Sequence, residues 1–148
     1  MITRATAADE AAIRTCAQQA YQRYVASIGK APAPMAADFR AQIAAGQVYV
    51  HRSSEGTLQG FIVFYPTANH MQLESVAVLP DWAGQGIGKA LIEFCESTAQ
   101  RAGLAAVQLY TNEKMTDNLA IYPRLGYVEV ERRSEDGFRR VFFTKALA

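Results

Sequence analysis

The stretch from Val76 to Leu91 has the residue types and spacing that bind an anion. An apolar run typical of a strand ends at Pro80, a glycine-rich turn follows over Ala83–Gly88, and a helix-periodic segment begins at once. This order directs backbone N–H groups from the loop and from a helix N-terminus at one place. Because unpaired amides and the helix dipole favour negative charge, the sequence predicts a phosphate or diphosphate site. We expect its ligand to be a nucleotide-like cofactor.

Strands of alternating polarity and one amphipathic helix would hold this turn in place. The three strand candidates before it are Val48–Arg52, Leu58–Pro66 and Met71–Leu79, and we expect them to form an antiparallel meander. After the turn, the sequence predicts a helix over Gly86–Ala102. One apolar face of that helix carries Ile87, Leu91 and Cys95 at helical spacing.

The remaining segments complete an alternating order of strands and helices. Further strands are expected over Ile2–Ala5, Ala106–Thr111, Tyr127–Arg133 and Phe138–Lys145, the last two turning at Glu135–Gly137. Further helices are expected from Thr6 up to the break at Ser27–Pro34, over Ala36–Ala45 and over Asp117–Leu125. The resulting order is β-α-α-β-β-β-α-β-α-β-β. It predicts an α/β (α+β) fold, with a mixed, mostly antiparallel sheet and helices on both faces.

Composition excludes several classes of protein. The 148 residues suit one domain, half of them are apolar and a fifth are charged, as in a globular chain. The formal net charge of +1 creates no global field that would recruit nucleic acid or an anionic membrane. No apolar run approaches the ~20 residues that span a bilayer. We therefore expect neither a nucleic-acid partner nor a membrane partner.

The N-terminus and the cysteines both favour a cytoplasmic location. Met1–Glu10 carries acidic residues where a signal peptide needs an apolar core. Cys16 and Cys95 each fall on an apolar helix face, which predicts reduced core thiols rather than a disulfide or a reactive pair.

Two motifs resemble those of a known family. Ala83–Gly88 is similar to the acetyl-CoA-binding motif of GNAT-superfamily N-acetyltransferases, (Gln/Arg)-x-x-Gly-x-(Gly/Ala) after a strand. Asn118–Tyr127 closely matches the companion segment that contains a tyrosine and closes on Leu-Gly-Phe. The resemblance implies a GNAT-like fold over residues 1–148 as one domain, acetyl-CoA as cosubstrate and no metal. Ala83 departs from the motif, because the family usually has a basic or amide side chain there.

The same resemblance implies how the donor binds. The cofactor-binding residues would be Val76, Ala77, Val78, Ala83, Gly84, Gln85, Gly86, Ile87, Gly88, Lys89 and Asn118. Loop amides would hold the diphosphate, and Lys89 would add charge nearby. An N–H at Val76 or Val78 would stabilise the oxyanion, an effect worth about 3–4 kcal/mol. Asn118 would bond the pantetheine arm or cap its own helix.

Acetyl transfer also needs proton carriers. An alkyl amine has a pKa of about 10.4, so a base must remove its proton at neutral pH. Glu74 is the candidate base, since alternation places it on the strand face of Val76 and Val78. A solvated carboxylate is the alternative for Glu74, and His70 or a water chain would be other carriers.

The resemblance gives Tyr122 the role of general acid for the leaving thiolate, and a core aromatic is the alternative for this residue. Pro123 follows it inside the expected helix, at an interior cost of ~3 kcal/mol, which leaves the direction of the Tyr122 hydroxyl open.

The acceptor side is less specific. Tyr21, Tyr24 and the loop from Ile28 to Met35 lie where the superfamily builds its acceptor pocket, although helix packing would also explain the tyrosines. We expect direct attack by a small-molecule or peptide amine in a ternary complex. A non-catalytic acyl-CoA-binding sensor or partner module is the alternative function. The apolar last strand at Val141–Phe143 favours a homodimer.

Overall fold

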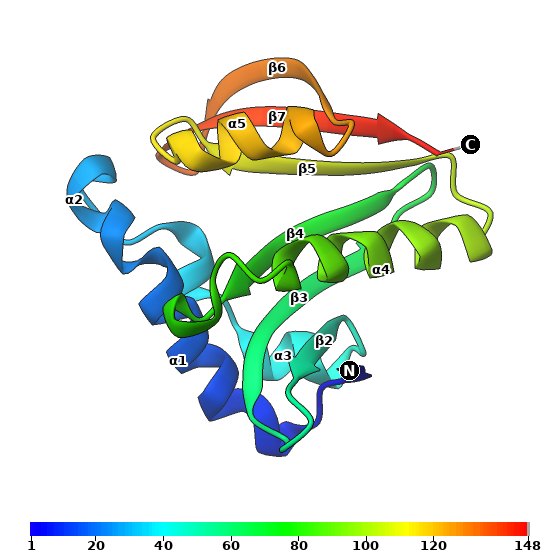
Figure 1. Ribbon diagram of the computed structural model, residues 1–148. Helices are drawn as coiled ribbons and strands as arrows, with labels where there is room; N and C mark the ends of the chain where they lie inside the picture. Colours follow the sequence, from blue (N-terminus) through cyan, green and yellow to red (C-terminus); the bar gives the residue numbers. More distant parts are fainter. Residues whose placement is uncertain (148) are drawn as a thin grey trace. The chain divides into compact units, whose positions relative to one another are not determined.

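The computed structural model describes residues 1–147 as a mixed α/β fold (Figure 1). The strands are β1 Ile2–Arg4, β2 Val48–Arg52, β3 Leu58–Pro66, β4 Met71–Val78, β5 Ala106–Asn112, β6 Val128–Glu135 and β7 Phe138–Ala146. The helices are α1 Glu10–Tyr21, α2 Val25–Ile28, α3 Phe39–Ala44, α4 Ile87–Arg101 and α5 Thr116–Arg124. Single 3-10 turns lie at η1 Ala7–Asp9, η2 Gln22–Tyr24, η3 Ala33–Ala36 and η4 Pro80–Trp82.

The strands confirm the predicted mixed, mostly antiparallel sheet. Seven strands lie in the hydrogen-bonded order β1-β2-β3-β4-β5-β7-β6. The pairs β1–β2, β2–β3, β5–β7 and β7–β6 are antiparallel, whereas β4 and β5 are parallel. Strands β2 and β3 have the predicted bounds, because their apolar alternation ends at turn-forming residues. The last hairpin turns as predicted, with Asp136 at φ 52° and Gly137 at φ 81°.

The helix expected over Ala36–Ala45 begins three residues later than predicted. Ala36 instead ends the 3-10 turn η3, and α3 begins at Phe39. The reason is a cap: the Asp38 carboxylate accepts a hydrogen bond from the Ala41 N–H at 3.1 Å. A capping side chain therefore sets this helix start, where helix propensity alone predicted an earlier one.

The chain divides into two compact units, which are described separately. Unit 1 consists of Met1–Phe64 and Ser75–Phe94. On β3, the Phe61 ring lies 5.4 Å from Phe39 of α3, and the Phe64 ring lies 6.0 Å from Phe94 of α4. Because residues 61 and 64 point to opposite faces of a strand, α3 and α4 cover opposite faces of this unit. The predicted placement of helices on both faces is confirmed here.

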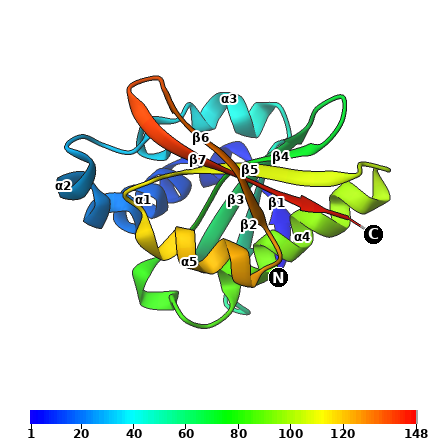
Figure 2. The same ribbon diagram turned by 90° about the horizontal axis from the view of Figure 1, so that it is seen from above.

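Unit 2 consists of Tyr65–Glu74 and the chain from Cys95 onward. Helix α5 lies along one face of β5 and β7 (Figures 1 and 2), where the Tyr122 and Phe143 rings are 5.7 Å apart. The preceding residue of β7, Phe142, faces the other side, and its ring lies 5.6 Å from the Tyr110 ring. The strands of unit 2 therefore have one helix-covered face and one face carrying Tyr110 and Phe142.

Strand β7 lies inside unit 2, so the predicted reason for a homodimer is wrong. Val141 and Phe143 are only 0% and 2% exposed, and the Phe143 ring lies 5.7 Å from Tyr122 of α5. These apolar side chains are part of the hydrophobic core of unit 2. The homodimer itself stays a prediction.

Both cysteines are free and buried, which confirms the prediction of core thiols. Burial raises the pKa of the Cys16 thiol to about 12. Burial, with a smaller contribution from Glu96, raises the pKa of the Cys95 thiol to about 12 as well. Neither thiol would ionise near neutral pH. Within residues 1–147, the helices are too short or too polar for any of them to cross a membrane.

An ion pair at the start of the chain should make stability pH-dependent. Burial disfavours the Asp9 carboxylate, but the Thr6 N–H at 2.9 Å and the Arg52 guanidinium outweigh burial and lower the pKa of Asp9 below its ordinary 3.8. A lowered pKa in the folded chain means that this contribution is complete near neutral pH and is lost as the pH falls below 3.8.

We therefore expect Asp9→Asn to lower the free energy of unfolding by about 1–2 kcal/mol at pH 7, with the difference shrinking in acid. Urea unfolding at several pH values measures this. Asp38→Asn is the matched control, because asparagine caps a helix as well as aspartate does and the Asp38 carboxylate accepts from a backbone N–H. Equal losses at pH 7 and pH 3 would contradict the assignment.

Candidate active site

The predicted anion-binding turn has the geometry that such a turn requires. Residues 83–86 are exposed, and α4 starts directly after them, with the Gly86 carbonyl accepting from the Ala90 N–H at 3.0 Å. Gly84 and Gly86 have φ of 81° and 82°, which only glycine adopts without strain. A Cβ atom at either glycine would meet no other atom within 4 Å. The loop therefore has open space beside its backbone, and its residues fit a diphosphate held by amides.

Side chains add little charge to this turn. Ala83 contributes only its backbone, as the sequence indicates. The Lys89 ammonium lies 4.0 Å from the Glu93 carboxylate, and both side chains are well exposed. An exposed pair of this kind is weak, so the Lys89 side chain can turn toward an anion at small cost.

The last part of β4 directs backbone groups away from β3. The Leu79 N–H donates to the Gln59 carbonyl of β3 at 2.9 Å, and a Cβ at Gly60 of β3 would lie 2.7 Å from the Ala77 carbonyl oxygen. Because peptide groups alternate along a strand, those of Val76 and Val78 point to the opposite edge. These are the two N–H groups that the sequence nominates as oxyanion donors.

Glu74 of β4 accepts hydrogen bonds from two phenols. The Tyr65 hydroxyl lies 3.3 Å from one carboxylate oxygen, and the Tyr110 hydroxyl lies 3.2 Å from the other. Burial and the negative charge of Glu74 raise the pKa of Tyr110 to about 12 and raise that of Tyr65 as well. Both phenols therefore stay protonated donors at neutral pH. This half-buried, bonded carboxylate differs from a simply solvated one.

Sequence reasoning missed both phenols. Tyr65 lies across the β3–β4 turn from Glu74, so the hairpin pattern would have suggested it. Tyr110 comes close only through the parallel pairing of Met71–Leu73 with Val107–Leu109. No local pattern in the sequence reveals that register.

His70 has both ring nitrogens engaged within its own turn. One nitrogen lies 3.1 Å from the Thr67 hydroxyl, and the other lies 3.1 Å from the Gln72 side-chain oxygen. The Thr67 hydroxyl also donates to the His70 carbonyl at 2.8 Å. These contacts tie the β3–β4 turn together, which favours a structural role over proton transfer.

Tyr122 is held by the motif that ends α5. The Tyr127 N–H donates to the Tyr122 carbonyl at 3.1 Å, and the Gly126 N–H donates to the Pro123 carbonyl at 3.1 Å. With Gly126 at φ 95°, these bonds form a Schellman motif, and the Tyr122 and Tyr127 rings make its apolar contact at 5.7 Å. Pro123 lies in the last helical turn, which α5 completes at Arg124. Tyr122 is thus a buried, well-packed aromatic whatever its chemical role.

Asn118 does not cap its helix, which was one alternative for it. It is the third residue of α5, and Met115 occupies the N-cap position. The Asn118 amide instead donates to the Thr111 hydroxyl at 3.1 Å, and that hydroxyl contacts the Met115 sulfur at 3.5 Å. The Asn118 side chain therefore ties α5 to β5.

The residues predicted for the acceptor pocket lie in unit 1. Tyr21 and Tyr24 are buried, whereas Ile28 at the end of α2 and Met35 in η3 are half-buried. The Tyr21 hydroxyl donates to the Val76 carbonyl at 2.7 Å. The Tyr24 hydroxyl accepts from Arg23 at 2.7 Å. Unit 1 therefore holds the predicted donor loop and the acceptor residues, and unit 2 holds Glu74, His70, Asn118 and Tyr122.

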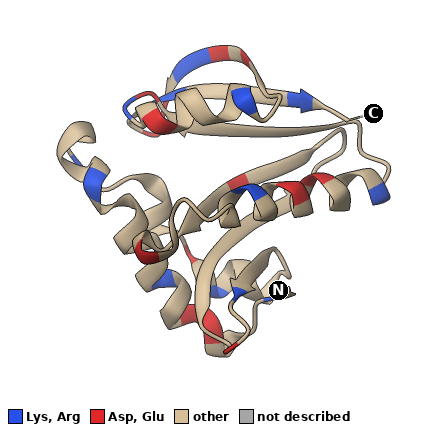
Figure 3. Ribbon diagram, in the orientation of Figure 1, with Lys and Arg blue, Asp and Glu red and all other residues tan. Residues whose placement is uncertain are grey.

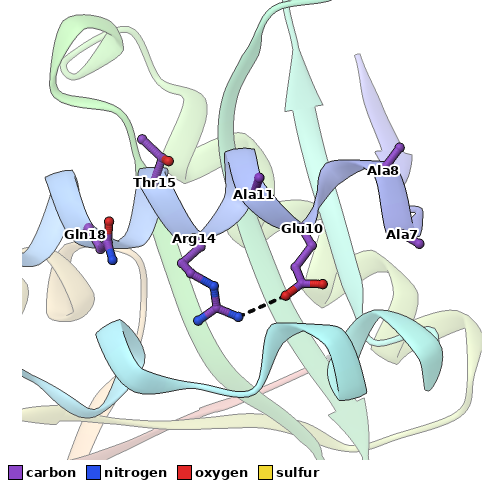
Figure 4. A pocket seen from close by; sticks show the side chains of 7 residues that line it. All are labelled: Ala7, Ala8, Glu10, Ala11, Arg14, Thr15 and Gln18. Atoms are coloured by element: carbon purple, nitrogen blue, oxygen red, sulfur yellow. Dashed lines mark hydrogen bonds and ion pairs between the residues drawn. The ribbon is translucent and has the colours of Figure 1, made fainter.

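Other polar features have simpler explanations. A cavity of about 490 Å³ lies along α1 (Figure 4), lined by the Glu10–Arg14 ion pair and by alanine, threonine and glutamine side chains, and it includes none of the predicted site residues. Arginines of the β6–β7 hairpin pair with nearby glutamates, so charges of both signs mix there (Figure 3). Among the described residues, no three His, Cys, Asp or Glu side chains converge as metal ligands would.

Comparison with known proteins identifies relatives of this chain. A family model described as the acetyltransferase (GNAT) family matches residues 10–127. An aminoalkylphosphonate N-acetyltransferase from Salmonella typhimurium is 37% identical over 76 residues, which are 51% of this chain and 44% of the relative. A ribosomal protein bS18-alanine N-acetyltransferase from Escherichia coli K12 is 27% identical over 55% of each chain. The chain thus spans about half the length of these curated relatives.

Solved structures share the fold. The PaiA N-acetyltransferase of Thermoplasma acidophilum, in complex with coenzyme A, has a TM-score of 0.79 at 19% identity, covering 99% of this chain and 98% of its own. The ribosomal-protein-S18-alanine N-acetyltransferase of Escherichia coli has a TM-score of 0.78 at 19% identity, covering 100% and 94%. At such identities the likeness concerns the fold alone.

Proposed function

The chain belongs to the acetyltransferase (GNAT) family, and from this premise we propose that it transfers an acetyl group from acetyl-CoA to a primary amine. The single observation that carries the proposal is the open turn at Gly84 and Gly86 directly before the 15-residue helix α4. We also propose that residues 1–148 act as one domain, because the matching region at residues 10–127 includes parts of both units.

Unit 1 would hold the donor. Amides of the turn and of the first turn of α4 would bind the diphosphate, where the helix dipole adds its partial positive charge. The donor supplies an activated thioester carbonyl. The N–H groups of Val76 and Val78, which point away from β3, would donate to its oxygen as the amine adds. Asn118, a residue of unit 2, would contact the pantetheine arm.

Glu74 would accept the proton of the attacking amine. Each carboxylate oxygen has two lone pairs, so one phenol bond per oxygen leaves capacity for an N–H donor. Tyr65 and Tyr110 would hold the carboxylate in a single orientation. As the C–N bond forms and the C–S bond breaks, the proton released by nitrogen would pass to Glu74.

Tyr122 would return a proton to the departing thiolate. Its ring packs on Phe143, whereas Glu74 bonds Tyr110 on the Phe142 face, so the two groups approach from opposite faces of the unit 2 strands. Opposite approach suits a direct reaction, since one group serves the incoming amine and the other the leaving sulfur.

The acceptor would be an amine of small-molecule or peptide type, met by Tyr21, Tyr24, Ile28 and Met35. The names of the two curated relatives describe an aminoalkylphosphonate and the alanine of a ribosomal protein as acceptors, which supports an amine nitrogen as the common element. The buried free thiols support a cytoplasmic location.

The donor site predicts a specific effect of one glycine. Gly86→Ala should weaken coenzyme A binding about tenfold in calorimetry, because a left-handed φ costs a non-glycine residue roughly 1–2 kcal/mol and the loop would change its shape. Gly56→Ala is the matched control, since Gly56 has φ 86° with nothing within 4 Å and lies in the β2–β3 turn. Both variants should lose similar stability, and only Gly86→Ala should lose affinity.

Two outcomes would contradict the proposal that this chain is an acetyltransferase. If the wild-type chain shows no saturable binding of coenzyme A at low salt, the proposal fails outright. Tight binding without thiol release from acetyl-CoA would instead favour the acyl-CoA sensor. The acceptors for that assay are 2-aminoethylphosphonate, an alanine-initiated peptide, a lysine peptide and spermidine.

The base predicts a loss of turnover at neutral pH. Glu74→Gln should lower kcat/KM at pH 7 by a factor of about 10²–10⁴, because an amide cannot take up the proton of the amine. Thiol release from acetyl-CoA measures this rate. Glu55→Gln, which changes an exposed carboxylate in the β2–β3 turn, is the control and should keep the wild-type rate. An unchanged rate in Glu74→Gln would discard this base.

The proposed role of Tyr122 as general acid predicts that its loss lowers kcat without changing the KM for acetyl-CoA. Tyr122→Phe should lower kcat by a factor of at least about 10² and leave the KM for acetyl-CoA within about twofold, since the ring keeps its packing. Tyr127→Phe is the matched control, because it removes the buried hydroxyl that bonds Glu96 at 2.8 Å in the same aromatic cluster. Unchanged turnover in Tyr122→Phe would leave this phenol as a core aromatic only.

A further inference from the structure

One side-chain contact joins the first helix to the strand that precedes the anion-binding turn. Tyr21, the last residue of α1, donates its hydroxyl hydrogen to the Val76 carbonyl oxygen at 2.7 Å. The two residues are 55 positions apart, and the tyrosine is buried. The carbonyl belongs to the edge of β4 that β3 does not use.

This contact lies next to a predicted oxyanion donor. In an extended strand, the C=O of one residue and the N–H of the residue two positions on point to the same edge, where a parallel neighbour would bind both. The Val76 carbonyl and the Val78 N–H form such a pair. The Tyr21 hydroxyl therefore binds the Val76 carbonyl oxygen and lies on the same edge of β4 as the Val78 N–H.

The backbone around Ala77 and Val78 is also approached closely by β3 and by the start of α4. A Cβ at Gly60 of β3 would lie 2.7 Å from the Ala77 oxygen and 3.3 Å from the Val78 Cα atom. At the start of α4, a Cβ at Gly88 would lie 3.6 Å from the Val78 side chain. Close backbone approach thus limits movement of Val78 toward β3 and α4. The Tyr21 hydroxyl supplies a polar contact on the remaining edge.

On the basis of the proposed function, we propose that Tyr21 is a positioning residue that keeps the Val78 N–H directed at the thioester carbonyl oxygen. An oxyanion donor is effective only if it is already oriented, because reorientation during the reaction would cost part of its benefit. By holding the Val76 carbonyl, Tyr21 restrains rotation of the adjoining peptide groups. In addition to the acceptor contact proposed for its ring, its hydroxyl thus acts on the donor side of the reaction.

The inference is tested by binding, without any acceptor. The two probes are acetyl-CoA, which is not consumed by transfer when no acceptor is present, and S-ethyl-CoA, which has the same chain length with CH2 in place of the carbonyl. The ratio of their dissociation constants measures the contact to the carbonyl oxygen. We expect the wild-type chain to prefer acetyl-CoA about tenfold, as one well-oriented hydrogen bond allows.

Tyr21→Phe should reduce this preference to about twofold or less, while the affinity for coenzyme A itself stays within about twofold. Tyr49→Phe is the matched control. Tyr49 is a half-buried phenol of β2 whose hydroxyl accepts from Arg4 at 3.1 Å, so its loss removes a hydroxyl from the same unit without touching β4. This variant should retain the wild-type ratio. A merely structural role for Tyr21 would not change the ratio.

Three other results would overturn the positioning role of Tyr21. An unchanged ratio of dissociation constants in Tyr21→Phe overturns this role and leaves the proposed function standing. Loss of coenzyme A binding by Tyr21→Phe also overturns it, because a positioning residue leaves the diphosphate contacts intact. If the wild-type chain binds neither probe nor coenzyme A, the proposed function fails and the role of Tyr21 falls with it.

Discussion

The arrangement of this protein depends on how the chain changes from strand to helix between β4 and α4. At this point the backbone must turn sharply, and two glycines with positive φ make that turn without strain. The consequence is electrostatic, because N–H groups of the loop and of the first helical turn end up without intrahelical partners. An anionic ligand would satisfy them, and the small, exposed residues of the loop leave space for it.

Strand β4 serves two environments along its length. Its first half belongs to unit 2, where Met71–Leu73 pair with β5 and the Glu74 carboxylate receives two phenols. Its second half belongs to unit 1, where Gly60 admits the Ala77 carbonyl at close range and Tyr21 takes the Val76 carbonyl. A charged group and a set of directed amides thus follow each other on one strand, and the proposed acetyl transfer would use both.

Much of the fold could be predicted because its signals are local. Strands β2 and β3 alternate in polarity and end at turn-forming residues, and the Asp136–Gly137 turn has residues that tolerate positive φ. The start of α3 could not be predicted from periodicity, because the Asp38 side chain caps the helix. The place of β7 could not be predicted either. Its apolar residues would suit an interface or a core, and only the packing of α5 against Phe143 distinguishes the two.

By itself, the sequence determined the order of elements, the glycine turn before α4 and the family, because each depends on short stretches of neighbouring residues. Only the tertiary structure decided the partners of the chemical groups. It brought Tyr110 to Glu74 through a parallel register and Tyr21 to Val76 across 55 residues, and it bonded Asn118 to Thr111 of β5. Such contacts arise from the pairing of strands and helices that are distant in the chain. The polarity pattern of one segment does not determine which other segment packs against it.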